Sequence, residues 1–149
     1  MEKQEKFEGK FEFLEHTADV YVAAHGATME EALGNAALAM FEVMTDTEKV
    51  AQTHKDALEV EAEDEYALLY SWLEALLVKF EVNGTLYSKF DVHSVKETLT
   101  GFKLEATAYG EKFDAKKHPQ KVGVKAITYH QMEFIKQREK ITLMFLLDI

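Results

Sequence analysis

The sequence predicts an α+β fold, with two helices packed on a mostly antiparallel, multi-stranded sheet. The first half contains two stretches whose apolar residues recur at the three-and-four spacing of a helix. The second half follows the apolar alternation of strands almost to its end. Helices in one half and strands in the other are typical of α+β proteins. At 149 residues the chain has the length of one domain, which we expect to cover 1–149.

The first two strands are expected on either side of a short polar segment. Apolar and other residues alternate at 11–13 and again at 20–24, as in half-buried strands. His16-Thr17-Ala18-Asp19 lies between these stretches and is expected to form a turn or bulge. The segment places a carboxylate, that of Asp19, where one strand is followed by the next.

The first helix is expected over about 28–44. Thr28 and Glu31 form a capping box, in which the threonine hydroxyl and the glutamate side chain bond free amides of the first turn. Apolar residues then recur at helical spacing from Leu33 to Met44.

A second helix is expected after a short strand at 57–62. Asp64 is placed as its N-cap, and a second apolar stripe runs from Leu69 to Phe80. Asn83-Gly84 supplies a residue that adopts the left-handed conformation easily and so ends the helix.

Strand patterning dominates from Leu86 onward and predicts a meander. The expected strands are 86–96, 98–110, 121–128, 131–137 and 140–148, with turns near Thr100-Gly101 and around His118-Pro119. The last run is apolar on both alternating faces, which favours a central strand that is covered on both sides.

Composition excludes several classes of function. The absence of cysteine rules out disulfides, thiolate nucleophiles, zinc-thiolate sites and iron–sulfur clusters. A formal net charge of −10 with a single arginine, Arg138, does not suit binding to a phosphate backbone, so no direct nucleic-acid binding is expected. The charged start at 1–6 is unlike a signal peptide, and no apolar run is long enough for a membrane span. We therefore expect a soluble, cytoplasmic protein.

The familiar catalytic motifs are also missing. None of the seven glycines forms a dinucleotide or Walker loop, and no serine lies in a GxSxG motif. The six histidines show neither HxxxH nor HExxH spacing, so a zinc hydrolase is not expected. Scattered histidines of this kind are usually surface groups or hydrogen-bonding neighbours of a site.

Acidic groups in the early turn, at Asp19, and at the end of the sequence, at Asp148 and Ile149, are candidate metal ligands. Asp148-Ile149 closes the sequence, so the Asp148 side chain and the Ile149 carboxylate are one residue apart at the tip of a strand. Such anions repel each other unless a cation or a set of donors compensates them, and calcium and magnesium bind oxygen ligands of this type. The alternatives are a solvated chain end and, for Asp19, an Asx-turn. The residues alone favour these alternatives over a metal site.

Several motifs occur in a fixed order along the chain. They are His16–Val20; Thr28–Ala32 with Asn35–Ala37 and Phe41; Met44–Asp46; Asp64 with Leu68-Leu69 and Trp72-Leu73; Gly110-Glu111 with Asp114 and His118; Val124–His130; and Asp148-Ile149. In this order, and over nearly the whole chain, they resemble the archease family. One departure is Glu74, where the family often has asparagine.

The resemblance implies a cofactor protein that is not itself an enzyme. Members of the family activate the GTP-dependent tRNA-splicing RNA ligase by promoting guanylylation of its active-site histidine, which permits multiple turnover. The resemblance also implies a divalent cation, most often calcium with magnesium or manganese as alternatives, held by Asp19, Asp148 and Ile149. The expected partner is the ligase, without a membrane and without directly bound nucleic acid.

Two other functions remain open. A general chaperone or specificity modulator of RNA-modifying enzymes, such as tRNA methyltransferases, would need an exposed apolar patch instead of a metal site. A metal-dependent hydrolase would use the same carboxylates to activate water.

Accessory roles are also expected near the proposed ligands. Lys125 lies opposite the apolar set of its strand pattern and would pair with an acidic neighbour, contact a phosphate or form an ordinary surface ion pair. His16 and His130 would orient ligands as hydrogen-bond donors or be ordinary histidines. Three further aspartates are interpreted first as cap or turn residues: Asp46, Asp64 and Asp114.

Overall fold

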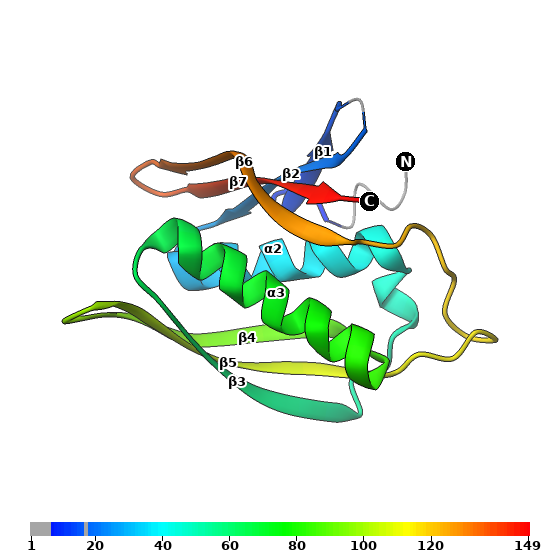
Figure 1. Ribbon diagram of the computed structural model, residues 1–149. Helices are drawn as coiled ribbons and strands as arrows, with labels where there is room; N and C mark the ends of the chain where they lie inside the picture. Colours follow the sequence, from blue (N-terminus) through cyan, green and yellow to red (C-terminus); the bar gives the residue numbers. More distant parts are fainter. Residues whose placement is uncertain (1–6, 17) are drawn as a thin grey trace.

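Two helices lie between two antiparallel sheets in this computed structural model, in which residues 7–16 and 18–149 are described (Figure 1). The α+β class predicted from the sequence is confirmed. The elements in chain order are β1 (Phe11–Leu14), β2 (Val20–Gly26), α2 (Met29–Met44), the short 3-10 helix η1 (Thr47–Lys49), β3 (His54–Ala62), α3 (Glu65–Asn83), β4 (Thr85–Thr98), β5 (Gly101–Lys112), β6 (Ala126–Lys136) and β7 (Ile141–Asp148).

The described strands form a four-stranded sheet of order β1-β2-β7-β6 and a three-stranded sheet of order β3-β5-β4. Because β7 pairs with both β2 and β6, the predicted central position of the last strand is confirmed. The predicted meander is broken after β5, where the chain crosses to the other sheet. The connection at 113–125 forms no strand, although its Val124 side chain is buried in the core. The alternation of apolar residues before Ala126 therefore reflects burial of the Val124 side chain and not pairing with another strand.

Both helix starts follow the sequence prediction. The Thr28 hydroxyl accepts a hydrogen bond from the Glu31 amide at 3.1 Å, and Asp64 Oδ1 accepts one from the Ala67 amide at 2.7 Å. Gly84 ends α3 with a φ of 69°, the left-handed conformation that glycine adopts without a Cβ clash. Among the described residues, no helix combines the length and apolarity needed to cross a membrane.

The predicted strands at 121–128 and 131–137 are instead a single interrupted strand, β6. Thr128 pairs with Leu146, but the next paired residue of β6 is Glu133, opposite Met144. Residues 129–132 therefore lie opposite one residue of β7, as a wide bulge. Gln131 within it has a φ of 59°, which is unusual for a residue other than glycine. The sequence shows two apolar runs with a break between them. Because periodicity does not show which strand a run pairs with, the two runs were predicted as separate strands although both pair with β7.

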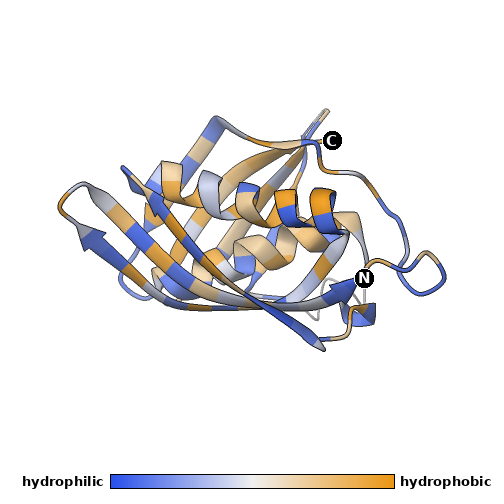
Figure 2. Ribbon diagram, turned by 60° about the horizontal axis from the view of Figure 1, so that its bottom comes forward, coloured by the Kyte–Doolittle hydropathy of each residue, from blue (hydrophilic) through white to orange (hydrophobic). Residues whose placement is uncertain are grey.

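The core lies on both sides of the helices. Trp72 of α3 is fully buried and donates its indole N–H to the Leu33 carbonyl of α2 at 2.9 Å, which ties the two helices together. Hydrophilic and hydrophobic residues alternate along the strands of the three-stranded sheet (Figure 2). This sheet therefore has one face toward the helices and the other toward solvent.

Candidate functional site

Strand register brings Asp19 and Asp148 to neighbouring positions. Val20 of β2 and Leu147 of β7 form the last pair of their antiparallel ladder, so Asp19 and Asp148 are the next residues beyond its end. The early turn and the last residues of the chain, far apart in sequence, therefore meet at one end of the four-stranded sheet.

The segment before β6 joins the same end of the sheet. Ala126 pairs with Asp148, and the Lys125 amide donates a hydrogen bond to the Asp148 carbonyl at 2.7 Å. Lys125 is exposed beside the buried Val124, as its place in the sequence pattern predicts. Three separate segments thus surround the predicted ligands.

The two carboxylates are accessible and like-charged. Asp148 is exposed and Asp19 is half-buried. His16 lies beside Asp19, with its Nδ1 3.9 Å from Asp19 Oδ2. Within the described residues, no lysine or arginine forms an ion pair with either carboxylate. Neighbouring like charges of this kind favour a compensating cation.

The donor chemistry of this end of the sheet suits a hard divalent cation, which binds carboxylate and carbonyl oxygens. Among the described residues, no group of three or more histidine, cysteine, aspartate or glutamate side chains is arranged to hold a metal. The predicted set has two such side chains, Asp19 and Asp148, and takes its third ligand from the main chain at Ile149. The remaining oxygens would come from water or from another molecule, and the metal assignment stays a prediction.

The other predicted residues have mainly structural roles. Asp46 and Asp64 cap η1 and α3, and Asp114 Oδ1 accepts the Lys116 amide at 2.9 Å, so the cap and turn interpretations are confirmed. The His130 amide donates to the Thr128 hydroxyl at 3.0 Å within the β6 bulge. Thr17, part of the motif around Asp19, lies outside the described residues.

His118 lies in a buried polar cluster that was not predicted from the sequence. The Asp114 amide donates to His118 Nδ1 at 2.9 Å, so the ring proton is on Nε2, which donates to Glu111 Oε2 at 2.8 Å. Glu111 also accepts the Lys117 ammonium at 2.7 Å and the Ala51 amide at 2.8 Å. The hydrogen bonds from Lys117 and the Ala51 amide, and then that from His118, lower the pKa of Glu111 to about 2 against the opposing effect of burial.

A buried ion pair was also missed. Glu42 of α2 is only 4% exposed, and its Oε2 lies 2.7 Å from the Lys121 ammonium. Its Oε1 accepts both the amide and the hydroxyl of Thr47, at 3.0 and 2.8 Å. A glutamate in a helix is ordinarily solvent-exposed. The partner of Glu42, Lys121, belongs to the 113–125 connection and is far away in sequence, so the helical pattern does not indicate the pair. Both clusters hold this connection in place before it enters β6.

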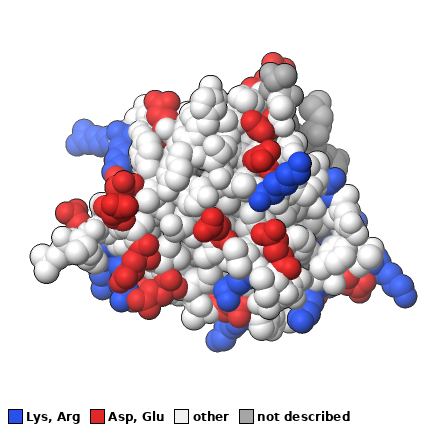
Figure 3. Space-filling model, viewed as in Figure 1, with Lys and Arg blue, Asp and Glu red and all other residues white. Residues whose placement is uncertain are grey.

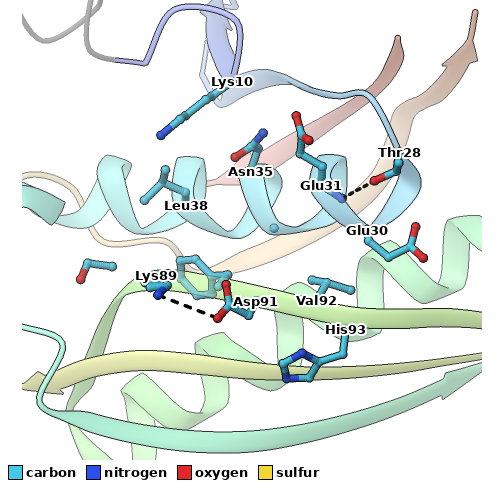
Figure 4. Close-up of a pocket in the computed structure, with 13 residues that line it drawn as sticks. Lys10, Thr28, Glu30, Glu31, Asn35, Leu38, Lys89, Asp91, Val92 and His93 are labelled. Carbon is cyan, nitrogen blue, oxygen red and sulfur yellow. Dashed lines mark hydrogen bonds and ion pairs between the residues drawn. The ribbon is translucent and has the colours of Figure 1, made fainter. Parts of the chain in front are cut away.

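The cavity in Figure 4 lies between α2 and β4 and is distinct from the predicted site. Its volume is about 580 Å³, and its polar wall combines both signs of charge, including Lys10, Glu30 and Asp91. Glu31 is committed to the helix cap, and Lys89 lies 3.9 Å from Asp91. None of the three predicted metal ligands lines it.

The fold and the convergent acidic strand ends define a small two-sheet α+β protein, and comparison with known proteins agrees with this class. The model of the Archease protein family (MTH1598/TM1083) matches residues 11–149. The protein archease of Sulfurisphaera tokodaii is 45% identical over 140 residues, which cover 94% of this chain and 99% of that one. That of Pyrococcus abyssi is 43% identical over 127 residues, covering 85% and 89%. The chain belongs to the archease family.

Solved structures give the same fold. The solution structure of Methanobacterium thermoautotrophicum protein 1598 has a TM-score of 0.81 and 38% identity, covering 95% of this chain and 99% of that one. The crystal structure of a Thermotoga maritima archease, described as a possible chaperone, has a TM-score of 0.61 and 18% identity, covering 91% and 94%. At that identity the second structure supports the fold alone. These relatives are named as archeases or a possible chaperone, and not as enzymes.

Proposed function

We propose that this protein is a non-enzymatic cofactor of the GTP-dependent tRNA-splicing RNA ligase. It would promote attack of the ligase's active-site histidine on the α-phosphate of GTP, which forms the guanylylated histidine and releases pyrophosphate. Membership of the archease family supports this function. The observation that carries it is the convergence of Asp19 and Asp148 at an accessible end of the four-stranded sheet.

The charge of the chain fits a division of labour with the ligase. A net charge of −10 and a single arginine disfavour contact with RNA, and the sequence contains no phosphate-binding loop. The ligase would therefore bind GTP and tRNA, while this protein acts on the ligase by contact. An acidic surface also steers the protein toward a basic cleft.

The acidic strand end would carry a divalent cation, calcium or else magnesium or manganese, held by Asp19, Asp148 and Ile149. Bound there, the cation would neutralise the clustered carboxylates and present positive charge to an oxygen ligand of the partner. The pairing of Val20 with Leu147 supports this proposal, because it brings the segments that carry the two aspartates to the same end of the sheet. The protein would either supply metal to the ligase or stabilise the ligase conformation that aligns histidine with GTP.

The direct test is single-turnover guanylylation of a cognate ligase with wild-type protein and with Asp19→Ala or Asp148→Ala. Each variant is expected to lose at least about tenfold in stimulated rate, because even loss of a hydrogen-bonding partner of a metal ligand typically costs that much. Glu97→Ala, an exposed carboxylate on β4, is the matched control and should stimulate fully. Folded Asp19 and Asp148 variants that both stimulate like wild type would contradict the metal-dependent mechanism.

A general chaperone or specificity modulator is the second candidate. The Thermotoga maritima protein that shares this fold is described as a possible chaperone. Exposed apolar residues are also present, including Val82 at 74% and Leu99 at 106% exposure. This function would survive Asp19→Ala and would need no ligase. A metal-dependent hydrolase, in contrast, would turn over a phosphoester with no partner present.

A further inference from the structure

An aromatic patch is exposed where α3 faces the edge strand β6. We define it as Tyr66, Tyr70, Tyr129 and Phe134. The rings of Tyr70 and Tyr129 are stacked, with centroids 4.6 Å apart and planes 6° apart, and those of Tyr66 and Phe134 lie 4.7 Å apart. Tyr129 remains 52% exposed and Tyr66 40% exposed. Two of the four rings therefore keep much of their surface in water.

The β6 bulge accompanies this arrangement. Tyr129 is the first of the residues, 129–132, that lie outside the regular pairing with β7, and it stacks on α3. The left-handed backbone of Gln131 costs about 1 kcal/mol or more for a residue with a Cβ. Packing explains why Tyr70 and Phe134 lie in this seam between β6 and α3. It does not require Tyr129 to be half exposed, and bulges often redirect side chains at functional surfaces.

Glu74 lies one turn beyond Tyr70 on α3, so a carboxylate neighbours the stacked pair. The pKa of Tyr70 is raised by the charge of Glu74 and then by burial, while the pKa of Tyr129 is raised by burial and then by Asp64, Glu74 and Glu63. The nearby Lys136 is already paired with Glu65. Acidic side chains are also spread over the face of the molecule shown in Figure 3, where α3 lies in front, and the basic ones lie mostly toward its margins. The rings therefore lie in a negative field that attracts cations.

Arginine matches both features of the patch. Its planar guanidinium stacks on tyrosine rings while its N–H groups bond carboxylates, whereas lysine presents only a compact, strongly hydrated charge.

We propose that the stacked Tyr70 and Tyr129, with Glu74 beside them, receive an arginine side chain of the RNA ligase. This inference rests on the proposed function, because that function supplies the partner. The patch is near the acidic strand end: Ala126 of β6 pairs with Asp148, and Tyr129 follows three residues later (129 − 126). A ligase that contacts Asp19 and Asp148 reaches the patch along the same edge strand. The patch contributes affinity, and the acidic strand end contributes activation.

Binding and activation are measured separately to test this division. The affinity of labelled protein for the ligase is measured by fluorescence anisotropy without GTP, and guanylylation is measured with the same preparations. Tyr129→Ala and Glu74→Arg are expected to weaken binding about tenfold or more, as loss of a desolvated cation–π contact or a charge reversal does. At saturating protein the guanylylation rate should equal that of wild type. Glu74→Asn should weaken binding less and reduce its salt dependence.

Matched controls separate the patch from general surface effects. Tyr129→Phe keeps the stacking face and should bind within about twofold of wild type. Val82→Ala removes an exposed apolar side chain near the end of α3, twelve residues after Tyr70 (82 − 70), and should leave binding unchanged. Thermal unfolding of each variant shows whether it is folded, and Glu74→Arg tests the exposed helix surface without removing a ring.

The outcomes distinguish this inference from the proposed function. If wild type binds and stimulates while Tyr129→Ala and Glu74→Arg bind equally well, the patch assignment is wrong and the proposed function stands. If wild type binds without stimulating and both variants bind weakly, the patch is supported and the proposed function is overturned. If wild type does not bind the ligase at all, both are overturned.

Discussion

At the residue scale, single carboxylates organise the connection that leads into β6. Glu111 gathers hydrogen bonds from an ammonium, a backbone amide and the buried His118 ring. Because its folded pKa of about 2 lies below the ordinary value of 4.5, its stabilising effect is fully present above about pH 4.5 and is lost as the pH falls toward 2. Acid should therefore loosen this part of the chain.

Glu111→Gln tests this role. The variant keeps the shape but loses the charge that the three donors share, so we expect it to be less stable at pH 7 by about 1–3 kcal/mol. Its stability should also depend less on pH between about 4.5 and 2 than that of wild type. Urea unfolding at pH 7, 4 and 3 measures both effects. Equal pH slopes for the two proteins would mean that Glu111 titrates normally.

Individual residues were predictable where their role is local. Asp64 as a cap and Gly84 as a helix end both follow from neighbours within a few positions. The buried role of Glu42 and the bond from the Ala51 amide to Glu111 were not predictable, because the partners are distant in sequence. A single sequence contains no signal that pairs Glu42 with Lys121.

At the element scale, helices were easier to predict than strands. Helix hydrogen bonds form within the segment, so the stripes and caps predicted α2 and α3 closely. A strand needs a partner that its own sequence does not specify. For that reason only the structure shows that the strands form two sheets. It also shows that two predicted strands are one strand, β6.

The cap of α3 gives a prediction at this scale. Asp64→Ala leaves the Ala67 amide without its side-chain acceptor and should lower the free energy of unfolding by about 1 kcal/mol. Asp64→Ser should restore most of this loss, because serine is also a good N-cap. Urea midpoints at constant slope measure the change. An alanine variant as stable as the serine variant would show that the cap contributes little.

At the scale of the whole molecule, the candidate site depends on topology. Asp19 and Asp148 were singled out from the sequence through the family resemblance, but only the pairing of β2 with β7 shows that they are neighbours. Their adjacency comes from a contact between the second and the last strands of the chain. No local pattern could have revealed it.

Cation binding by the folded protein tests whether Asp19 and Asp148 form a metal site. Calcium should raise the unfolding midpoint of wild type in a concentration-dependent manner, because a ligand that binds only the folded state stabilises it by mass action. Asp19→Asn and Asp148→Asn should abolish the shift, and Glu97→Gln should retain it. A midpoint that does not change across millimolar calcium, magnesium or manganese would contradict the proposed site.

The central position of β7 also affects how the molecule is made. Residues 141–148 are synthesised after the other described strands, yet they join β2 to β6. The nascent chain must therefore hold its first hairpin without this partner until residues 141–148 have been made, whereas β3, β4 and β5 are synthesised early enough to assemble beforehand. Loss of residues 141–148 would thus remove the strand on which the four-stranded sheet assembles.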